Sequence, residues 1–319
     1  MIVVTGGAGF IGSHFVEILN EIGSTDLLIV DDLTDGRKIH NLAGREFSDY
    51  LDRDDFIKRI EVAGDLQNIS AVIHQGACSA TTEWDARYLM QVNYEYSKRL
   101  LAACQKRRIP FVYASSASVY GLGLNGFREE PGCELPINAY AFSKWQFDQY
   151  VRRMIASRSA PIVGLRYFNV YGSREDHKAS MASTAHHFAN QVLSNGKARL
   201  FSGSHGYGPG EQRRDFVDVR DCVNAALWFL GAPDRSGIYN LGTGEARPFN
   251  DVARVVIEQL GFGEIEYVPF PDHLLGAYQA FTEANLGALR AAGYPGSFRS
   301  IEAGIASMTS ALREKHVAA

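Results

Sequence analysis

The stretch MIVVTGGAGFIG, residues 1–12, decides the fold because an apolar segment runs directly into a glycine-rich turn. Ile2 to Val4 are expected to form a buried strand, and Gly7, Gly9 and Gly12 fit the pattern G-x-G-x-x-G. In this pattern the first glycine permits a tight turn, the second lets backbone approach a pyrophosphate, and the third lets a helix pack closely on the strand. The phosphates would lie at the helix N-terminus, where free N–H groups point at them. The stretch therefore predicts a dinucleotide-binding site.

The sequence after this turn favours a bound nucleotide over the alternative of a glycine turn that binds nothing. Apolar residues recur at helical spacing as far as Ile22, as expected of a helix that packs on the first strand. A second apolar strand, Leu27 to Val30, then ends in Asp31 and Asp32. Asp31 follows Gly12 by about twenty residues, the spacing at which an acid usually meets the ribose hydroxyls of a dinucleotide.

Composition indicates a chain that acts on a small molecule. The chain has 319 residues, of which 46% are hydrophobic, and a net charge of −4, with 32 basic and 36 acidic residues scattered along it. Scattered charge of this kind disfavours nucleic acid and an anionic membrane as main partners. No apolar run approaches the roughly eighteen residues of a spanning helix, and the first strand leaves no room for a signal peptide, so we expect a cytoplasmic protein.

The cysteines give no sign of a disulfide or a metal site. Cys78, Cys104, Cys133 and Cys222 form no C-x-x-C pair and have no companion histidine at a metal-ligand spacing. Reduced thiols are therefore expected, and no metal is predicted.

Short apolar runs alternate with longer segments that have room for helices. Three further strands are expected at Ala71 to His74, Phe111 to Ala114 and Ile162 to Tyr167. Runs such as Phe-Val-Tyr-Ala suit strands that are buried on both faces of a parallel sheet, with crossover helices between them. The sequence therefore predicts an α/β fold with a doubly wound parallel sheet.

The regular alternation breaks up after about Asn169, which predicts a second, smaller α/β domain for the substrate. This part of the chain holds a glycine-rich stretch, residues 203–210, and two late helical patterns, Phe249 to Leu260 and Ile301 to Arg313. No repeat and no long linker separates independent domains. The expected division is a nucleotide-binding domain of residues 1–168 with a return segment of about 213–244, and a substrate domain of about 169–212 and 245–319.

Tyr140 and Lys144 are the expected catalytic pair, because residues four apart face the same way on a helix. A tyrosine that acts as a base near neutral pH needs its pKa lowered by about three units, roughly 4 kcal/mol, which a neighbouring ammonium and a positive nicotinamide ring can supply. A Y-x-x-x-K pair alone also fits an exposed helical pair. Ser116 favours the catalytic interpretation, because it follows the strand from Phe111 at the carboxyl edge of the sheet, where sites of such folds form. Ser116 would hold the substrate oxygen beside Tyr140.

Several motifs together resemble the extended short-chain dehydrogenase/reductase superfamily. They span most of the chain, and the resemblance implies a Rossmann-like fold. Besides the glycine turn and Tyr140 with Lys144, they are Ser-Ser-Ala-Ser-Val-Tyr-Gly (115–121), Arg-Tyr-Phe-Asn-Val-Tyr-Gly (166–172), Arg-Asp-Phe-Val-Asp-Val (214–219) and Asn-Leu-Gly-Thr-Gly (240–244).

Three further segments resemble the ADP-glyceromanno-heptose 6-epimerases more narrowly. They are His-Gln-Gly-Ala-Cys-Ser-Ala-Thr-Thr-Glu-Trp-Asp (74–85), His-Lys-Ala-Ser-Met-Ala-Ser (177–183) and Tyr-Gln-Ala-Phe-Thr (278–282). The resemblance implies interconversion of the two C6 epimers of ADP-glycero-manno-heptose, for the inner core of bacterial lipopolysaccharide. Hydride would leave C6 for bound NADP and return to the other face of a transient 6-keto intermediate.

Such an inversion requires acid–base groups on both faces of C6. Tyr140 is one, and the resemblance implies Lys178 as the other. Judged from the residues alone, Lys178 in Arg-Glu-Asp-His-Lys fits a solvated surface charge better, because charge runs usually are solvated.

The resemblance also implies binding roles for the residues that match. The resemblance implies cofactor contacts for Phe10, Ile11, Lys38, Gln75, Gly76, Ala77, Cys78, Ser79 and Asn93, in addition to those expected from the residues themselves for Gly9, Asp31, Asp32, Arg53 and Lys144. Substrate contacts are implied for Ser116, Asn169, Val170, Ser180, His187, Phe201, Ser202, Gly203, Ser204, Arg214 and Tyr278. Arg214 suits a two-point contact with a diphosphate, and Tyr278 suits a hydroxyl contact with sugar or phosphate. Taken singly, His187 more often lies on a helix surface and Phe201 in a core.

Two opposing signals bear on the choice of cofactor. Asp31 and Asp32 at the end of the second strand normally accept the ribose hydroxyls of NAD and repel a 2′-phosphate. Arg37, Lys38 and Arg53 can offset these acids, and the resemblance implies NADP with a cation at Lys38. We therefore expect NADP, with NAD as the alternative.

Two departures from the pattern of the family concern the nucleotides. Asp32 stands where the family commonly has Asn. The glycine-rich segment His205 to Gln212 has the character of an insertion just before Arg214, where it would reshape the nucleotide end of the pocket.

Two other functions remain open. Another nucleotide-sugar enzyme, a 4-epimerase or a 4,6-dehydratase, would keep Ser116, Tyr140 and Lys144, but a dehydratase usually has an acidic pair where Ala117 and Ser118 stand. A cofactor-sensing protein that has lost catalysis tends to lose the tyrosine or lysine, and both are present. The family resemblance also implies a homopentamer.

Overall fold

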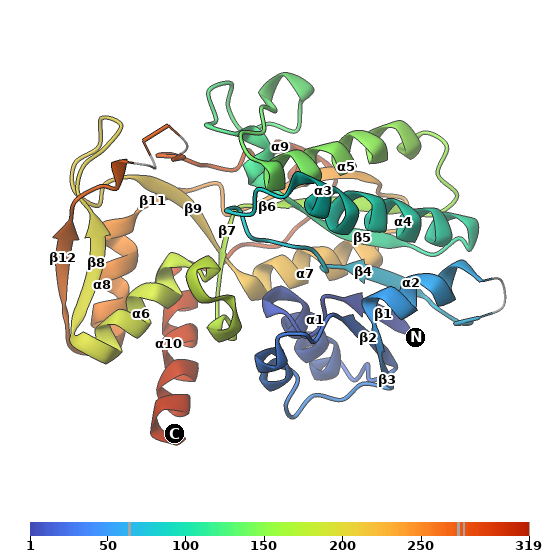
Figure 1. Cartoon of the computed structure of the whole chain (residues 1–319), viewed down its shortest axis with the longest axis horizontal. Coiled ribbons are helices and arrows are strands. Elements are labelled where there is room, and N and C mark those ends of the chain that lie inside the picture. The colour runs from blue at the N-terminus through green and yellow to red at the C-terminus, as the bar shows by residue number, and fades with distance from the viewer. Residues whose placement is uncertain (63–64, 273–274, 277, 319) are drawn as a thin grey trace. The chain divides into compact units, whose positions relative to one another are not determined.

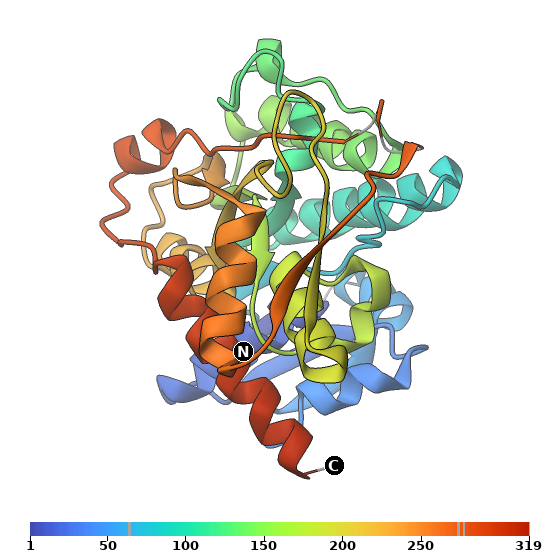
Figure 2. The same cartoon turned by 90° about the vertical axis from the view of Figure 1, so that its left-hand side faces the viewer.

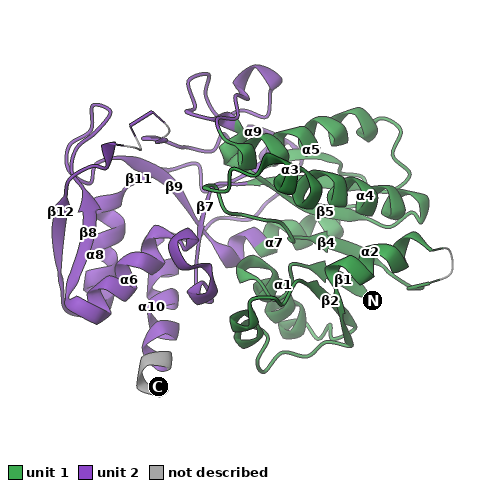
Figure 3. Cartoon of the chain, viewed as in Figure 1, with its two compact units in different colours: residues 1–119, 138–166, 223–239 green, residues 120–137, 167–222, 240–319 purple. Residues whose placement is uncertain are grey.

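The computed structural model describes residues 1–62, 65–272, 275–276 and 278–318 of the chain (Figure 1; Figure 2). The chain divides into two compact units (Figure 3). Unit 1 comprises residues 1–119, 138–166 and 223–239, and unit 2 comprises residues 120–137, 167–222 and 240–319. Each unit has a hydrophobic core of its own.

A seven-stranded sheet, built mainly from unit 1, has the order β10-β6-β5-β4-β1-β2-β3. Its strands are β1 (Ile2–Thr5), β2 (Leu27–Asp31), β3 (Asp49–Asp52), β4 (Ala71–His74), β5 (Phe111–Ser116), β6 (Ile162–Tyr167) and β10 (Gly237–Leu241). β1 pairs in parallel with β2 and β4, β2 with β3, and β4 with β5. The strand order reverses at β1 and β4, where a Rossmann-like sheet opens a crevice for its ligand. The predicted doubly wound parallel sheet is confirmed.

Helices follow the strands of unit 1 and cover both faces of the sheet. They are α1 (Phe10–Glu21), α2 (Arg53–Glu61), α3 (Ala86–Leu89), α4 (Tyr96–Lys106) and α5 (Ala139–Ile155), with a π-helical turn, Met90–Glu95, between α3 and α4. Side chains of α2, α4 and α5, among them Phe56, Leu100 and Phe147, share one core with Val3 of β1. The neighbouring Val4 points to the opposite face of β1 and is also fully buried, which accounts for the continuous apolar run in this strand.

Unit 2 contains smaller sheets. A three-stranded sheet has the order β11-β9-β7, in which β9 is antiparallel to β11 and parallel to β7, and β8 pairs in parallel with β12. The strands are β7 (Asn169–Tyr171), β8 (Lys197–Phe201), β9 (Arg213–Asp218), β11 (Ala246–Pro248) and β12 (Glu264–Val268). The helices are α6 (Thr184–Asn195), α8 (Phe249–Leu260), α9 (Gly287–Ala291) and α10 (Ile301–Ala318).

Helices α6, α8 and α10 bury one core with these strands. α8 lies beside both α6 and α10 (Figure 2). Phe188 of α6, Val256 of α8 and Ile305 of α10 belong to the same buried cluster as Leu200 of β8. The two late helical patterns of the sequence are therefore core helices of unit 2.

The two units divide at different residues from the expected domains. Residues 120–137 and 213–222 lie in unit 2, and α7 (Val219–Leu230) begins in unit 2 and ends in unit 1. Residues 213–218 form β9, which is hydrogen-bonded to β7 and β11 and therefore belongs with them. Residues 120–137 are tied to unit 2 by Tyr120, whose hydroxyl donates to Asn240 Oδ1 at 2.6 Å.

Among the residues that the structure describes, no helix is both long and apolar enough to cross a membrane.

Candidate functional site

The glycine turn after β1 brings two loops of unit 1 into direct contact. Gly6 has φ +66°, and a Cβ added there would lie 2.6 Å from the backbone nitrogen of Gly76, in the loop after β4. A Cβ on Gly12 would lie 2.0 Å from the carbonyl oxygen of Gly6, so α1 can begin close to the turn only if residue 12 is glycine. Gly9 is the N-cap of α1 and has no side chain to occupy the first N–H groups of the helix. These features are those that a bound pyrophosphate requires. Sequence reasoning missed Gly6, although the Gly-Gly pair was a visible signal.

A cavity of about 510 Å³ in unit 1 opens beside this turn. Seven of the predicted cofactor residues line it, from the ends of β2 and β4, the segments after them and the start of α2: Asp31, Asp32, Lys38, Arg53, Gly76, Ala77 and Cys78. The Gln75 side-chain oxygen and nitrogen are buried and have no hydrogen-bond partner in the described part of the chain. The cradle of glycines, the cavity and the orphaned amide together fit a dinucleotide.

Asn93, another predicted cofactor residue, does not line this cavity. Its amide holds the loop after β4 instead, since Nδ2 donates to the Cys78 carbonyl oxygen at 2.9 Å and Oδ1 accepts the Cys78 N–H at 2.8 Å. Nδ2 also lies 3.0 Å from the Ser143 hydroxyl of α5. Asn93 thus fixes the shape of the cofactor loop.

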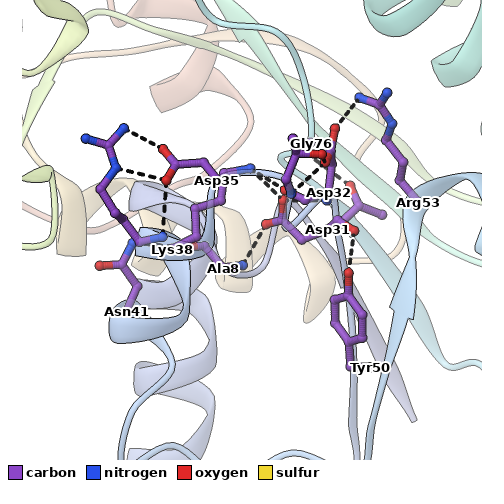
Figure 4. A network of polar contacts seen from close by, with 12 residues as sticks. Ala8, Asp31, Asp32, Asp35, Lys38, Asn41, Tyr50, Arg53 and Gly76 are labelled. Atoms are coloured by element: carbon purple, nitrogen blue, oxygen red, sulfur yellow. Dashed lines mark hydrogen bonds and ion pairs between the residues drawn. The ribbon is translucent and has the colours of Figure 1, made fainter. Parts of the chain in front are cut away.

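Cations already neutralise the acids at the end of β2 (Figure 4). Asp31 Oδ2 accepts the Ala8 N–H of the glycine turn at 2.8 Å, and Lys38 Nζ donates to Asp31 Oδ1 at 3.0 Å and to the Asp32 carbonyl oxygen at 2.8 Å. Arg53 Nη1 lies 3.3 Å from Asp32 Oδ2. Hydrogen bonds from Thr34, with Arg53 nearby, hold the pKa of Asp32 below its usual range.

Arg37 does not share this role in the way the sequence suggested. Its guanidinium forms two hydrogen bonds with Asp35, from Nε at 2.9 Å and from Nη2 at 2.7 Å. The exposed Arg37 side chain is thereby engaged with an acid of its own loop.

In unit 1 the structure brings Ser116 and Tyr140 together and places Lys144 one turn further along the helix that carries Tyr140. Tyr140 is in the first turn of α5, which Asn138 caps by accepting the Ala141 N–H at 2.8 Å. The Tyr140 hydroxyl is hydrogen-bonded to Ser116 at the end of β5. Lys144, one turn further along α5, donates from Nζ to the Ala114 carbonyl oxygen at 3.0 Å.

The electrostatics of this trio depend on burial. Burial raises the pKa of Tyr140, and the hydrogen bond from Ser116 opposes that rise. Burial also lowers the pKa of Lys144 to about 8, although the nearby Asp148 favours the charged form. The protein by itself therefore does not stabilise a phenolate, and the expected low tyrosine pKa needs a further positive charge, such as an oxidised nicotinamide ring, beside the hydroxyl.

Asp148 is a buried carboxylate of α5 that holds the elements carrying Ser116, Tyr140 and Lys144 together. It was not predicted from the sequence. It is fully buried and accepts hydrogen bonds from Tyr113 at 2.8 Å, Ser115 at 2.9 Å and Arg166 Nε at 2.9 Å. These bonds tie α5 to β5 and β6. They thereby fix the position of Lys144 relative to the carboxyl end of β5.

In unit 2, Lys178 lies in a short 3₁₀ turn, Asp176–Met181, with Ser180. Lys178 Nζ lies 2.7 Å from Oε2 of Glu175, a fully buried carboxylate. His187 of α6 approaches the Ser180 carbonyl oxygen at 3.4 Å through Nε2. Asn169 and Val170 lie in β7 of the same unit, so the turn and β7 are both parts of unit 2.

Arg214 is a buried cation of unit 2, and none of the carboxylates that the structure describes forms an ion pair with it. It lies in β9, is 7% exposed, and its guanidinium carbon is 5.0 Å from the ring centre of Tyr278 and 5.8 Å from that of Phe249. Burial lowers the pKa of Arg214 to about 10 and raises that of Tyr278. No carboxylate pairs with Arg214 within the described residues, so the site can bind an anion such as a diphosphate.

Aromatic rings surround Tyr278 and form one end of this site. Phe270 lies 5.1 Å, His205 6.0 Å and Phe201 6.4 Å from it between ring centres. Phe201 and Tyr278 were predicted, whereas Phe270 and His205 were missed because an aromatic residue in a loop carries no periodic signal.

Ser202, Gly203 and Ser204 shape the loop that carries His205. The Ser202 hydroxyl accepts the Phe270 N–H at 3.1 Å, and the Ser204 hydroxyl accepts from Gln212 Nε2 at 2.9 Å. A Cβ on Gly203 would lie 2.4 Å from the Tyr207 carbonyl oxygen, because the loop folds back on itself.

Within the described residues, no cluster of three or more His, Cys, Asp or Glu side chains could hold a metal ion.

Comparison with known proteins agrees with this chemistry. Residues 2–242 match the NAD dependent epimerase/dehydratase family. The chain is 57% identical over 314 residues to the ADP-L-glycero-D-manno-heptose-6-epimerase of Alkalilimnicola ehrlichii, with 98% of each chain covered. The crystal structure of the ADP-L-glycero-D-manno-heptose-6-epimerase of Helicobacter pylori has a TM-score of 0.85 and 28% identity, covering 98% of this chain and 96% of that one. The UDP-glucose 4-epimerase of Thermus thermophilus in complex with NAD has a TM-score of 0.79 and 29% identity, covering 98% of each chain.

Proposed function

The chain belongs to the NAD dependent epimerase/dehydratase family and, within it, to the ADP-L-glycero-D-manno-heptose 6-epimerases, and on this premise we propose how it acts. It inverts C6 of ADP-D-glycero-D-manno-heptose through a transient 6-keto intermediate, and so supplies the L-epimer for the inner core of lipopolysaccharide. The observation that carries the substrate assignment is the 57% identity, over 98% of the chain, to a protein of that name. Buried Arg214, paired with no carboxylate among the described residues, supports a diphosphate-bearing substrate.

Proton transfer in the proposed reaction starts at Tyr140. When bound, NADP supplies a hydride acceptor and donor that is not consumed. Tyr140 takes the proton of the 6-hydroxyl as hydride leaves C6, while Ser116 donates a hydrogen bond to the same oxygen. The Lys144 ammonium would bond the ribose of the bound cofactor, and together with the oxidised nicotinamide ring it would favour the phenolate.

Lys178 serves the opposite face in this proposal. After the ketone turns, the Lys178 ammonium gives a proton to the oxygen as the other face of C6 is reduced. Proton exchange with water then restores the phenolate of Tyr140 and the ammonium of Lys178. The cycle in the reverse direction exchanges the roles of Tyr140 and Lys178, so each epimer is deprotonated by a different group.

The proposed cofactor is NADP, bound by unit 1, whereas unit 2 binds the sugar nucleotide. The bonds from Lys38 to Asp31 and Asp32, and the pair between Arg53 and Asp32, support this choice. A ribose 2′-phosphate would be repelled by uncompensated carboxylates, and here two cations of the cavity wall offset them.

The test is to incubate the purified protein with NADP and ADP-D-glycero-D-manno-heptose and to follow the configuration at C6 by NMR. Approach to a mixture of both epimers without net NADPH is the expected result. No inversion, together with activity on a UDP- or dTDP-hexose, would leave the roles of Ser116, Tyr140 and Lys144 unchanged. It would replace the proposed substrate by that of a 4-epimerase. Light scattering of the same sample would test the homopentamer that the family resemblance implies.

Tyr140→Phe and Lys178→Met should each abolish inversion and leave NADP bound, because each removes one proton carrier and little binding surface. Isothermal titration with NADP and the NMR assay measure the two properties separately. Wild-type turnover by Lys178→Met would refute the two-base assignment.

A further inference from the structure

The buried carboxylate of Glu175 forms an ion pair with the ammonium group of Lys178. The Glu175 side chain is fully buried, whereas that of Lys178 is 20% exposed. Oε2 of Glu175 accepts from Lys178 Nζ at 2.7 Å and from the Ser183 N–H at 2.7 Å, and Oε1 accepts from the Ser183 hydroxyl at 2.6 Å. Both carboxylate oxygens are thus used, as a buried carboxylate requires.

The backbone around Lys178 is strained, so the turn itself needs support. Ala179 has φ +46° and ψ −124°, and Arg174 has φ +69°, both in the left-handed half of conformational space that residues with a Cβ rarely adopt. Such conformations persist when the surrounding structure imposes them, and they gather at functional sites.

Ser183 connects this turn to a regular element. It is the N-cap of α6 and accepts the His186 N–H at 3.2 Å while its own hydroxyl donates to Glu175. The Glu175 carboxylate therefore links Lys178 to the fixed start of a helix.

From these contacts we propose that Glu175 is the positioning residue of Lys178. A lysine side chain has four rotatable bonds, and a hydrogen bond to a fixed acceptor selects one position of the ammonium from many. Proton transfer to the substrate oxygen needs that position to be held to within a fraction of an ångström. The inference rests on the proposed role of Lys178 as the second acid–base group, and it adds the residue that orients it.

Glu175→Gln keeps the size of the side chain and removes the charge that holds the ammonium. We expect kcat of Glu175→Gln to fall at least about tenfold while KM for the heptose changes less than about threefold, because the substrate contacts remain. Glu258→Gln makes the same substitution on the exposed face of α8 and should match the wild type.

A second readout separates positioning from a purely structural role. Each epimer is mixed in a single turnover with the NADP-loaded enzyme, and absorbance of the reduced nicotinamide is followed. When only the Lys178 side is impaired, the epimer that Tyr140 deprotonates is oxidised and then trapped as ketone, so reduced cofactor accumulates. The other epimer gives none. Glu175→Gln should show this asymmetry with the same sense as Lys178→Met, and Tyr140→Phe should show the opposite sense.

Three results overturn the inference, and they are distinguishable from one another. Wild-type kcat in Glu175→Gln, or an equal loss from both epimers, refutes the role of Glu175 and leaves the two-base proposal intact. Wild-type turnover in Lys178→Met refutes the two-base proposal, and with it the role of Glu175. If Glu175→Gln fails to fold, Glu175→Asp carries the same test, since it keeps the charge and withdraws it from Lys178 by one methylene.

Discussion

At the residue scale, burial of the Lys144 ammonium lowers the free energy of unfolding. Its side chain is 8% exposed, and burial lowers its pKa from 10.5 to about 8. The unfolded chain therefore binds more protons than the native protein between these two pH values, so this contribution makes stability rise with pH there. Below about pH 8 the cost of burying the charge is present in full.

Lys144→Met should therefore raise the free energy of unfolding near pH 7 by about 1 to 3 kcal/mol, less whatever the lost bond to Ala114 contributed. The gain should shrink as the pH rises from about 8 toward 10.5, because the wild-type lysine then becomes neutral in the native protein. Urea denaturation at several pH values measures it. A Lys144→Met protein less stable than the wild type near pH 7 would contradict the argument. Lys106→Met, on the exposed side of α4, should stay within about 0.5 kcal/mol.

Site residues that stand at a regular spacing in the sequence could be predicted. Buried residues that orient other site residues could not. Tyr140, Lys144 and Ser116 stand at intervals that a helix and a strand end explain: Tyr140 lies beside Ser116, and Lys144 donates to the Ala114 carbonyl oxygen of the same strand. Glu175 and Asp148 were missed, because a lone acid in the sequence does not reveal which buried donors surround it. Arg214 was predicted as an anion contact through the resemblance, and its burial between two rings adds a physical reason.

At the scale of elements, the junction of β1 and α1 depends on close backbone contact. Gly12→Ala would place a Cβ 2.0 Å from the Gly6 carbonyl oxygen, a backbone atom that moves only if the turn moves. We expect a loss of about 1 to 3 kcal/mol in the free energy of unfolding, and weaker NADP binding, because the first turn of α1 is displaced. Thermal denaturation and cofactor titration measure the two effects.

Gly132→Ala provides the matched control for this substitution. A Cβ at Gly132 meets nothing within 4 Å, and its φ lies outside the left-handed region. It should unfold and bind NADP as the wild type does. If both alanine variants had the same free energy of unfolding and the same affinity for NADP, close packing at Gly12 would not be what the turn requires.

Buried elements were easier to predict than edge elements. β4 and β6 have the predicted bounds, because an apolar run between polar segments marks a strand buried on both faces. β5 runs two residues further than expected, to Ser116. β3 was missed because its sequence, Asp-Tyr-Leu-Asp, is half-exposed at the edge of the sheet and carries no apolar run. The strands of unit 2 are short or polar and gave little periodicity.

At the scale of the whole molecule, cofactor binding should appear as stability. A ligand that binds only the native protein at about 100 times its Kd raises the free energy of unfolding by about 2.7 kcal/mol. At equal concentration NADP should raise the melting temperature more than NAD does. Lys38→Ala and Arg53→Ala should each reduce the NADP shift, because each leaves a carboxylate uncompensated beside the 2′-phosphate.

The structure supplies a control of the same charge for this experiment. Arg37→Ala removes a cation that is engaged with Asp35, so the NADP shift should be retained. A larger shift with NAD than with NADP in the wild-type protein would reverse the choice of cofactor.

The division of the chain into two interleaved units has a consequence for synthesis on the ribosome. The last segment of unit 1, residues 223–239, contributes the start of β10, which lies beside β6 at the end of the sheet. Until that segment emerges, the growing chain presents β6 as an unpaired edge, which other chains can use as a template for pairing. At about 5 to 20 residues per second the delay between β6 and β10 lasts several seconds, a window in which a chaperone would protect the nascent protein.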